Sequence, residues 1–321
     1  MKQPLISFII PAYNEAVNIS SVFQEITKEM SKQSTYNYEV IYVDDGSTDD
    51  TLHFLQQLTQ FHPQVKYISF TRNFGKEAAI FAGLQHAKGN AVIMMDADLQ
   101  HPPTLIHDFL AGFEEGYDQV IAKRDRTGDS KVRSFLSSLY YRIVNKVVDV
   151  NLTDGEGDFR LLSRKAVQSL LSLSEGNRFS KGFYSWIGLD CKIVTYQNVT
   201  RKNGQTKWSL AKLFNYGLDG IFSFNQKPLR FCFYLGFFIL SISLLYILFI
   251  LVDIMLHGIS VPGYFTVISA VLFLGGIQLV SLGIIGEYIG RIYFETKKRP
   301  HYLVKYTNIE HKEIGEHHAV H

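Results

Sequence analysis

Two aspartates separated by one residue, Asp96 and Asp98, are the feature of the sequence that points most directly to chemistry. They lie in the stretch AVIMMDADLQHPP, residues 91–103. The apolar run at residues 92–95 has the length of a buried strand, and the two prolines that end the stretch stop any continuing strand. Carboxylates at the carboxyl end of a buried strand lie where open α/β sheets bind ligands. Their hard oxygen atoms suit Mg²⁺ or Mn²⁺ shared with a diphosphate, although a lone pair at this spacing is also common in solvated turns.

The elements that would position these aspartates are strands and helices that alternate along the first hundred residues. This alternation predicts a parallel, doubly wound α/β sheet, with polar loops after the first, second and fourth strands that meet at one edge. Neither G-x-G-x-x-G after the first strand nor G-x-x-x-x-G-K-[ST] is present, which disfavours the usual dinucleotide and P-loop sites. The predicted strands are at residues 5–10, 39–43, 65–70 and 92–95.

Another aspartate and a group of cations follow in the second half of the soluble region. A fifth strand is predicted at residues 120–122, and Arg124 is one of the cations in the loop after it. Asp158 follows a glycine in a segment that is predicted to lead into a helix starting near Ser163. An aspartate in such a position can be a cap or turn residue as readily as a catalytic one.

Two segments suggest contact with a lipid surface. The apolar stripe of residues 132–147 has cations beside it, which fits either packing against the core or a helix that lies on an anionic bilayer. The loop RKNGQTKW, residues 201–208, carries Arg201 and Lys207 and precedes an amphipathic helix. A basic loop is often only solvated, but this position favours phosphate capture near the headgroups.

Two long uncharged runs, residues 231–252 and 264–286, predict a pair of transmembrane helices. Lysines and arginines flank the outer ends of the pair, whereas the connector at residues 253–263 has none. The positive-inside rule therefore places both termini in the cytoplasm and the connector outside. The resulting division is a cytoplasmic domain at residues 1–226, a membrane region at 227–290 and a cytoplasmic tail at 291–321, which is expected to be solvated after Arg299.

The overall composition limits the classes of partner and compartment. A formal net charge of +2 gives no sign of nucleic-acid binding. The two cysteines, Cys191 and Cys232, do not form a disulfide framework, which fits a reducing cytosol for the soluble part.

The ordered motifs resemble the family-two inverting glycosyltransferases with the GT-A fold. More narrowly, the chain is similar to polyprenyl-phosphate glycosyltransferases, which include bactoprenol glucosyltransferases and, more distantly, dolichyl-phosphate mannose synthases. The Q-x-x-R-W signature of processive polysaccharide synthases is absent, and Thr206 stands where a serine is commoner in the family. The motifs that carry the resemblance are SFIIPAYNE, VDDGSTDDT, TRNFGKEAA, MDADLQHPP, GDFRLLSR, RKNGQTKW and IGEYIGRIYFETKKRP.

This resemblance implies roles for particular residues. Asp96 and Asp98 match the motif that binds the metal, Mg²⁺ or Mn²⁺, and the diphosphate, and Asp98 and Asp158 match the catalytic carboxylates. Arg201 and Lys207, with Arg124, correspond to cations near the acceptor phosphate. The positions that hold the nucleotide sugar in the family are Pro11, Tyr13, Glu15, Asp44, Asp96 and Asp98.

The function that the resemblance implies is the transfer of one hexose, with glucose as the first candidate, from a UDP-sugar to undecaprenyl or another polyprenyl phosphate. The expected location is the cytoplasmic face of a bacterial inner (plasma) membrane, and the expected assembly is a homo-oligomer such as a tetramer. One alternative keeps the acceptor and uses GDP-mannose or a UDP-aminosugar derivative as the donor. Another alternative is a non-catalytic membrane scaffold with a degenerate transferase fold, against which the intact Asp96, Asp98 and Asp158 argue.

Overall fold

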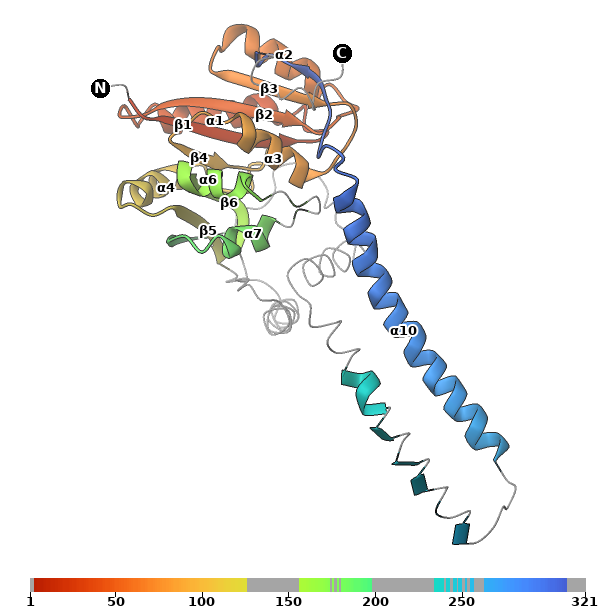
Figure 1. The fold of residues 1–321 in the computed structure, drawn as a ribbon. Helices are drawn as coiled ribbons and strands as arrows, with labels where there is room; N and C mark the ends of the chain where they lie inside the picture. The colour runs from red at the N-terminus through yellow and green to blue at the C-terminus, as the bar shows by residue number, and fades with distance from the viewer. Residues whose placement is uncertain are drawn as a thin grey trace.

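The computed structural model of the chain contains one eight-stranded sheet with helices on both faces (Figure 1). It describes residues 3–125, 156–173, 175, 178, 180–197 and 263–310, and short stretches between 234 and 256. The strand order is β7-β5-β6-β4-β1-β2-β3-β8. The strands are β1 (Leu5–Ala12), β2 (Asn37–Asp44), β3 (Val65–Phe70), β4 (Ala91–Met94), β5 (Gln119–Asp125), β6 (Glu156–Ser163), β7 (Cys191–Gln197) and β8 (Val304–Thr307).

The centre of the sheet is parallel, as the alternating pattern predicts. β1 pairs in parallel with β2 and β4, and β2 pairs in parallel with β3. β6 lies antiparallel between β4 and β5, so the sheet is mixed on this side. The sheet is thus Rossmann-like and mostly parallel at its centre, as the resemblance to the GT-A fold implies. The segment around Asp158 leads into a helix near Ser163 as predicted, since α6 (Arg164–Leu171) begins there with Ser163 as its N-cap. The segment itself forms strand β6, which was not predicted, and its side chains alternate: Phe159 and Leu161 are buried against one face of the sheet and Leu162 against the other.

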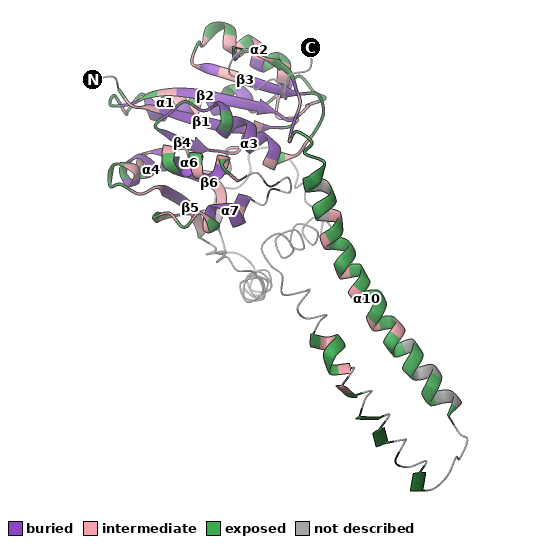
Figure 2. Ribbon diagram, in the orientation of Figure 1, coloured by how far each residue is buried: buried purple, intermediate pink, exposed green. Residues whose placement is uncertain are grey.

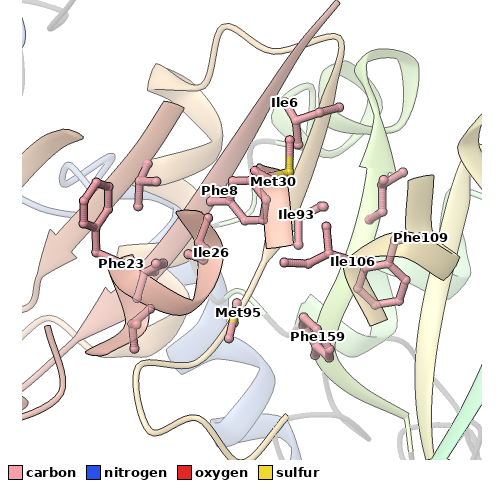
Figure 3. Close-up of a cluster of buried hydrophobic side chains, with 14 of the residues drawn as sticks. Ile6, Phe8, Phe23, Ile26, Met30, Ile93, Met95, Ile106, Phe109 and Phe159 are labelled. Atoms are coloured by element: carbon pink, nitrogen blue, oxygen red, sulfur yellow. The ribbon is translucent and has the colours of Figure 1, made fainter. Parts of the chain in front are cut away.

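Helices cover both faces because each parallel strand is apolar on both sides. Ile6, Phe8 and Ile10 of β1 pack on the face covered by α1 and α4, whereas Ile9 packs on the face of α3. Figure 2 shows the strands as a buried layer, and Figure 3 shows side chains of α1 and α4 meeting those of β1, β4 and β6. The helices of the soluble region are α1 (Ile19–Met30), α2 (Thr51–Phe61), α3 (Lys76–His86), α4 (Leu105–Glu114), α6 (Arg164–Leu171) and α7 (Ser180–Trp186).

The long helix α10 (Tyr264–Thr296) projects away from the soluble domain (Figure 1). Among the described residues it is the one helix long and apolar enough to cross a membrane, over Phe273–Gly290. None of that window is buried, and Phe273, Leu279 and Leu282 are each more than 60% exposed. A surface this apolar is unusual in water and fits contact with lipid. The first apolar run lies largely outside the described residues, so the pair of spans stays a prediction.

The chain returns to the sheet after α10, which corrects the expectation of a solvated tail after Arg299. β8 pairs antiparallel with β3 at the edge of the sheet. Tyr302 is fully buried, its ring stacks on Phe70 at 4.8 Å between centroids, and its hydroxyl donates to Gln85 Oε1 at 2.7 Å. The stacking and the hydrogen bond of Tyr302 hold this segment against the sheet. The polar residues around it in the chain did not indicate this packing. Residues 311–321 lie outside the described part, and the division of the chain at 226 and 290 stays a prediction.

Candidate functional site

Asp96 and Asp158 lie together at the carboxyl edge of the sheet and share one lysine. The antiparallel register of β4 and β6 pairs Met94 with Arg160, and the same register continued by two residues brings Asp96 opposite Asp158. Lys76 Nζ lies 2.6 Å from Asp96 Oδ1 and 2.7 Å from Asp158 Oδ2. The three side chains are partly exposed, at 43% for Lys76, 31% for Asp96 and 21% for Asp158, so a ligand can reach the cluster.

The charges in this cluster stabilise one another. Burial alone would lower the pKa of Lys76, but the carboxylates of Asp158 and Asp96 raise it well above its usual value. Burial would raise the pKa values of both aspartates, but Lys76 lowers them. At neutral pH the cluster therefore contains two carboxylates and one ammonium, with a net charge of −1.

A group of three aromatic side chains, His101, Phe159 and Tyr196, lies beside Asp96. The His101 ring stacks on Phe159 with 4.9 Å between centroids, and His101 Nε2 lies 3.7 Å from Asp96 Oδ2. His101 Nδ1 and the Tyr196 hydroxyl share a hydrogen bond of 2.7 Å. Tyr196 of β7 is the register partner of Arg124 of β5. Arg124, one of the cations predicted at the acceptor site, therefore lies on the strand next to this aromatic group.

Asp98 lies in a tight loop that follows β4. Its Oδ1 accepts a hydrogen bond from the backbone N–H of Gln100 at 3.2 Å, and Leu99 between them has a positive φ of 53°. This bond orients the Asp98 carboxylate in the loop directly after Asp96.

The loops after β1 and β2 are joined by hydrogen bonds. Asn14 has a positive φ of 54°, its N–H donates to Ser47 Oγ at 2.9 Å, and its Oδ1 accepts from Thr48 N–H at 2.9 Å. Three predicted nucleotide-sugar ligands, Pro11, Tyr13 and Glu15, belong to this connected segment. Tyr13 is exposed, whereas Pro11 and Glu15 are half-buried.

The adjacent aspartates Asp44 and Asp45 both shape loops. Asp44 is buried, with Oδ1 accepting from Ser47 N–H at 2.9 Å and Oδ2 from Ser69 Oγ at 2.7 Å. Asp45 Oδ1 accepts from Phe74 N–H at 2.7 Å, and Asp45 Oδ2 accepts from Gly75 N–H at 3.0 Å. Burial raises the pKa of Asp45 to about 6. These contacts assign Asp44 a structural task, and its predicted contact with the nucleotide stays a prediction.

A metal ion at this site would need ligands from a substrate. Within the residues that the structure describes, there is no group of three or more His, Cys, Asp or Glu that could hold a metal. Asp96 and Asp98 supply two hard carboxylates, which fits the habit of Mg²⁺ of using one or two carboxylates together with phosphate oxygens. The donor set therefore fits a metal that is shared with a diphosphate.

The structure brings some predicted residues together and adds others. Asp96, Asp98 and Asp158 meet at one edge, whereas Arg201 and Lys207 lie outside the described residues. Sequence reasoning assigned no role to Lys76, although the motif TRNFGKEAA contains it. Asp45 and His101, each within three residues of a predicted ligand, are also functional candidates that it missed.

Comparison with known proteins gives matches over nearly the whole chain. The family model "Glycosyl transferase family 2" matches residues 7–171, and the model "GtrB C-terminal hairpin" matches residues 227–292. CsbB of Bacillus subtilis (strain 168), whose name describes it provisionally as a glycosyltransferase, is 64% identical over 98% of this chain and 96% of its own. A bactoprenol glucosyl transferase of Shigella phage SfX is 42% identical over 94% of this chain and 98% of its own. A solved glucosyl-3-phosphoglycerate synthase from Mycobacterium tuberculosis, in complex with Mn²⁺, UDP and glucosyl-3-phosphoglycerate, aligns with a TM-score of 0.43 and 24% identity over 68% of this chain and 78% of that chain.

Proposed function

Because the chain belongs to glycosyl transferase family 2, we propose that it transfers a single hexose, glucose first among the candidates, from a UDP-sugar to polyprenyl phosphate. Relatives that are 42% identical over most of both chains and are named bactoprenol glucosyl transferases support this acceptor and this sugar. The site is proposed to work at the cytoplasmic face of a bacterial inner membrane.

The observation that carries the proposal is where the membrane helix joins the sheet. β8 runs antiparallel to β3, and its first residue Val304 pairs with Phe70, the last residue of β3. The parallel strands β1 to β4 end at this same edge, where Asp96 lies. Only residues 297–303 separate α10 from β8, a span of at most about 25 Å. This attachment supports a catalytic edge that is held close to the end of the membrane helix (Figure 1).

An acceptor with an isoprenoid tail requires such an arrangement. Each methylene withdrawn from the bilayer into water costs about 0.8 kcal/mol, so the lipid phosphate stays near the headgroups and the site must come to it. The attacking phosphate and the donor diphosphate repel each other, by about 4 kcal/mol per pair of unit charges at 4 Å with an effective dielectric constant of 20. Arg201 and Lys207, with Arg124, are the proposed counter-charges.

The carboxylates have separate tasks in this proposal. Asp96 and Asp98 would hold Mg²⁺ or Mn²⁺, which stabilises the negative charge of the departing nucleoside diphosphate. A lipid phosphate is already mostly anionic at neutral pH, so the reaction needs no strong base. Asp158, kept ionised beside Lys76, orients the sugar or the acceptor. In-line attack on the anomeric carbon inverts its configuration.

The alternative donors are GDP-mannose and a UDP-aminosugar derivative, and the names of the relatives favour neither. A non-catalytic scaffold is disfavoured because Asp96 and Asp158 converge on Lys76 in one half-buried site, and Asp98 lies in the loop directly after Asp96. We also propose a homo-oligomer, with a tetramer as the first candidate. Gly275, Gly276 and Gly283 on α10 have no atom within 4 Å of an added Cβ, which leaves room for close helix packing in lipid.

Substitution of Asp98 tests the metal-dependent part of the proposal. Asp98→Ala should reduce sugar transfer by about 100-fold or more, and chelation of the wild-type protein should have the same effect. Full activity of the wild-type protein in excess EDTA would remove the metal from the mechanism.

Substitution of the basic loop tests the acceptor site. Arg201→Ala and Lys207→Ala should weaken the use of lipid phosphate much more than the binding of UDP-sugar. If these variants instead bind the donor more weakly and keep wild-type acceptor kinetics, the two residues belong to the donor site.

A further inference from the structure

We propose that Lys76 is a positioning residue that makes metal binding depend on the nucleotide donor. In the absence of donor, its ammonium holds Asp96 and Asp158 together in place of a divalent cation. The metal then binds well only when the donor diphosphate arrives with its own negative charge. This inference rests on the proposed function, because it concerns the same metal-dependent site.

The Lys76 ammonium lies between the two carboxylates. Lys76 Nζ contacts Asp96 Oδ1 and Asp158 Oδ2 at ion-pair distances, and it is the closest cation to either carboxylate in the contacts described. Two carboxylates held this close need a cation between them, because like charges at short range disfavour ionisation of both. Lys76 supplies that cation from within the chain.

The site without a donor has little net negative charge and few ligands for a metal among the described residues. With Lys76 present, the Asp96–Asp158 cluster carries a net charge of −1, and a divalent ion that approaches Asp96 meets an ammonium already bound to Oδ1. No group of three or more His, Cys, Asp or Glu in the described part of the chain could hold a metal by itself. A donor diphosphate adds oxygen ligands for the metal, and its negative charge offsets the ammonium of Lys76.

The fold fixes the position of Lys76 through the backbone at the start of α3. It is the first residue of α3, and Gly75 before it has a positive φ of 100°. Asp45 accepts hydrogen bonds from the N–H groups of Phe74 and Gly75, which fixes the backbone where α3 begins. Lys76 is therefore placed by the loop after β2 as well as by its own helix.

The test measures Mn²⁺ affinity without catalysis, by electron paramagnetic resonance of the purified full chain in detergent, with and without UDP. Without UDP, Lys76→Met should bind Mn²⁺ about tenfold or more tightly than the wild type, because the competing cation is gone. UDP should tighten Mn²⁺ binding by the wild type much more than by the variant. Lys66→Met is the matched control, since Lys66 pairs with Glu39 at 2.8 Å elsewhere on the sheet and its loss should leave Mn²⁺ affinity unchanged.

The outcomes separate this inference from the proposed function. Equal Mn²⁺ affinities of Lys76→Met and wild type without UDP would overturn the role of Lys76, even if UDP still promotes binding. Absence of Mn²⁺ binding by the wild type with UDP would instead contradict the metal part of the proposed function. Lys76→Gln, which keeps a polar side chain without the charge, carries the same test if Lys76→Met does not fold.

Discussion

At the scale of single residues, the adjacent aspartates Asp44 and Asp45 show how much of a site depends on contacts outside its own motif. The sequence motif VDDGS indicated Asp44 as a nucleotide ligand and gave Asp45 no task. In the structure Asp45 joins the loop after β2 to the start of α3. Gly46 beside it has a positive φ of 66°, and an added Cβ would lie 2.3 Å from the carbonyl carbon of Arg72. Such contacts between loops far apart in the sequence are invisible to local patterns.

Substitution of Asp45 should lower the free energy of unfolding, and the loss should be larger when more hydrogen-bond acceptors are removed. Asp45→Ala leaves two backbone N–H groups without their acceptor, which costs about 1–3 kcal/mol. Asp45→Asn retains one acceptor oxygen and should cost less. Thermal unfolding of both variants in detergent measures the difference, and equal losses for Asn and Ala would show that the charge, rather than the acceptor, matters.

Glu77 should make stability depend on pH. Burial and the Asp158 carboxylate raise the pKa of Glu77 from 4.5 to about 7. Between these values the folded chain binds more protons than the unfolded chain, so the contribution of Glu77 to stability falls as pH rises through this window. Glu77→Gln cannot titrate. The unfolding temperature of the wild type relative to Glu77→Gln should therefore be lower at about pH 8 than at about pH 5, and a constant difference would contradict the shift.

At the scale of elements, the sequence predicted the parallel centre of the sheet but missed β6 and β8. The strands β1 to β4 are mostly apolar runs, which identify buried strands without tertiary information. β6 was missed because polar residues begin it, and Arg160 lies in its middle. The structure accommodates this buried cation under the Tyr184 ring at 3.9 Å and through a hydrogen bond from Nη2 to the Gly157 carbonyl oxygen at 2.7 Å.

β8 was missed because its stabilising contacts come from residues more than two hundred positions earlier. Tyr67 N–H donates to Asn308 Oδ1 at 2.8 Å, and Thr71 N–H donates to the Leu303 carbonyl oxygen at 3.0 Å. The sequence of β8 is only four residues long, and without these distant contacts it resembles a solvated tail.

Substitution of Tyr302 measures how much the segment around β8 contributes to the free energy of unfolding. Tyr302→Ala removes a fully buried aromatic ring and should cost about 3–5 kcal/mol. Tyr302→Phe removes only the hydrogen bond to Gln85 and should cost about 1 kcal/mol. Tyr306→Ala is the matched control, because this tyrosine of β8, four residues further along the chain, is 47% exposed. Similar unfolding temperatures for Tyr302→Ala and Tyr306→Ala would mean that the segment is not anchored as described.

At the scale of the whole molecule, charge and apolar length in the sequence predicted a soluble domain followed by membrane helices. The structure agrees for α10, whose 33 residues extend about 50 Å. The attachment of α10 to the sheet through β8 could not be predicted, because it depends on the pairing of distant segments. In the proposed function, that attachment holds the candidate site near the membrane end of α10.

Cysteine labelling tests the orientation in the membrane. In a background in which Cys191 and Cys232 are replaced by serine, Ser260→Cys should react with a membrane-impermeant maleimide added to intact cells. A chain that keeps only Cys191, which is exposed in the soluble domain, should react only after permeabilisation. The opposite pattern would invert the topology and place the catalytic edge outside.

Transfer of radiolabelled sugar from a panel of nucleotide sugars into lipid tests the proposed reaction most directly. Membranes that contain the wild-type chain, or Asp98→Ala as the control, are incubated with polyprenyl phosphate and UDP-glucose, UDP-aminosugars or GDP-mannose, and the lipid fraction is counted. Label from UDP-glucose should enter the lipid with the wild type and not with Asp98→Ala. Label that enters from another donor would change the sugar, and absence of lipid-linked label from every donor would contradict the proposed function.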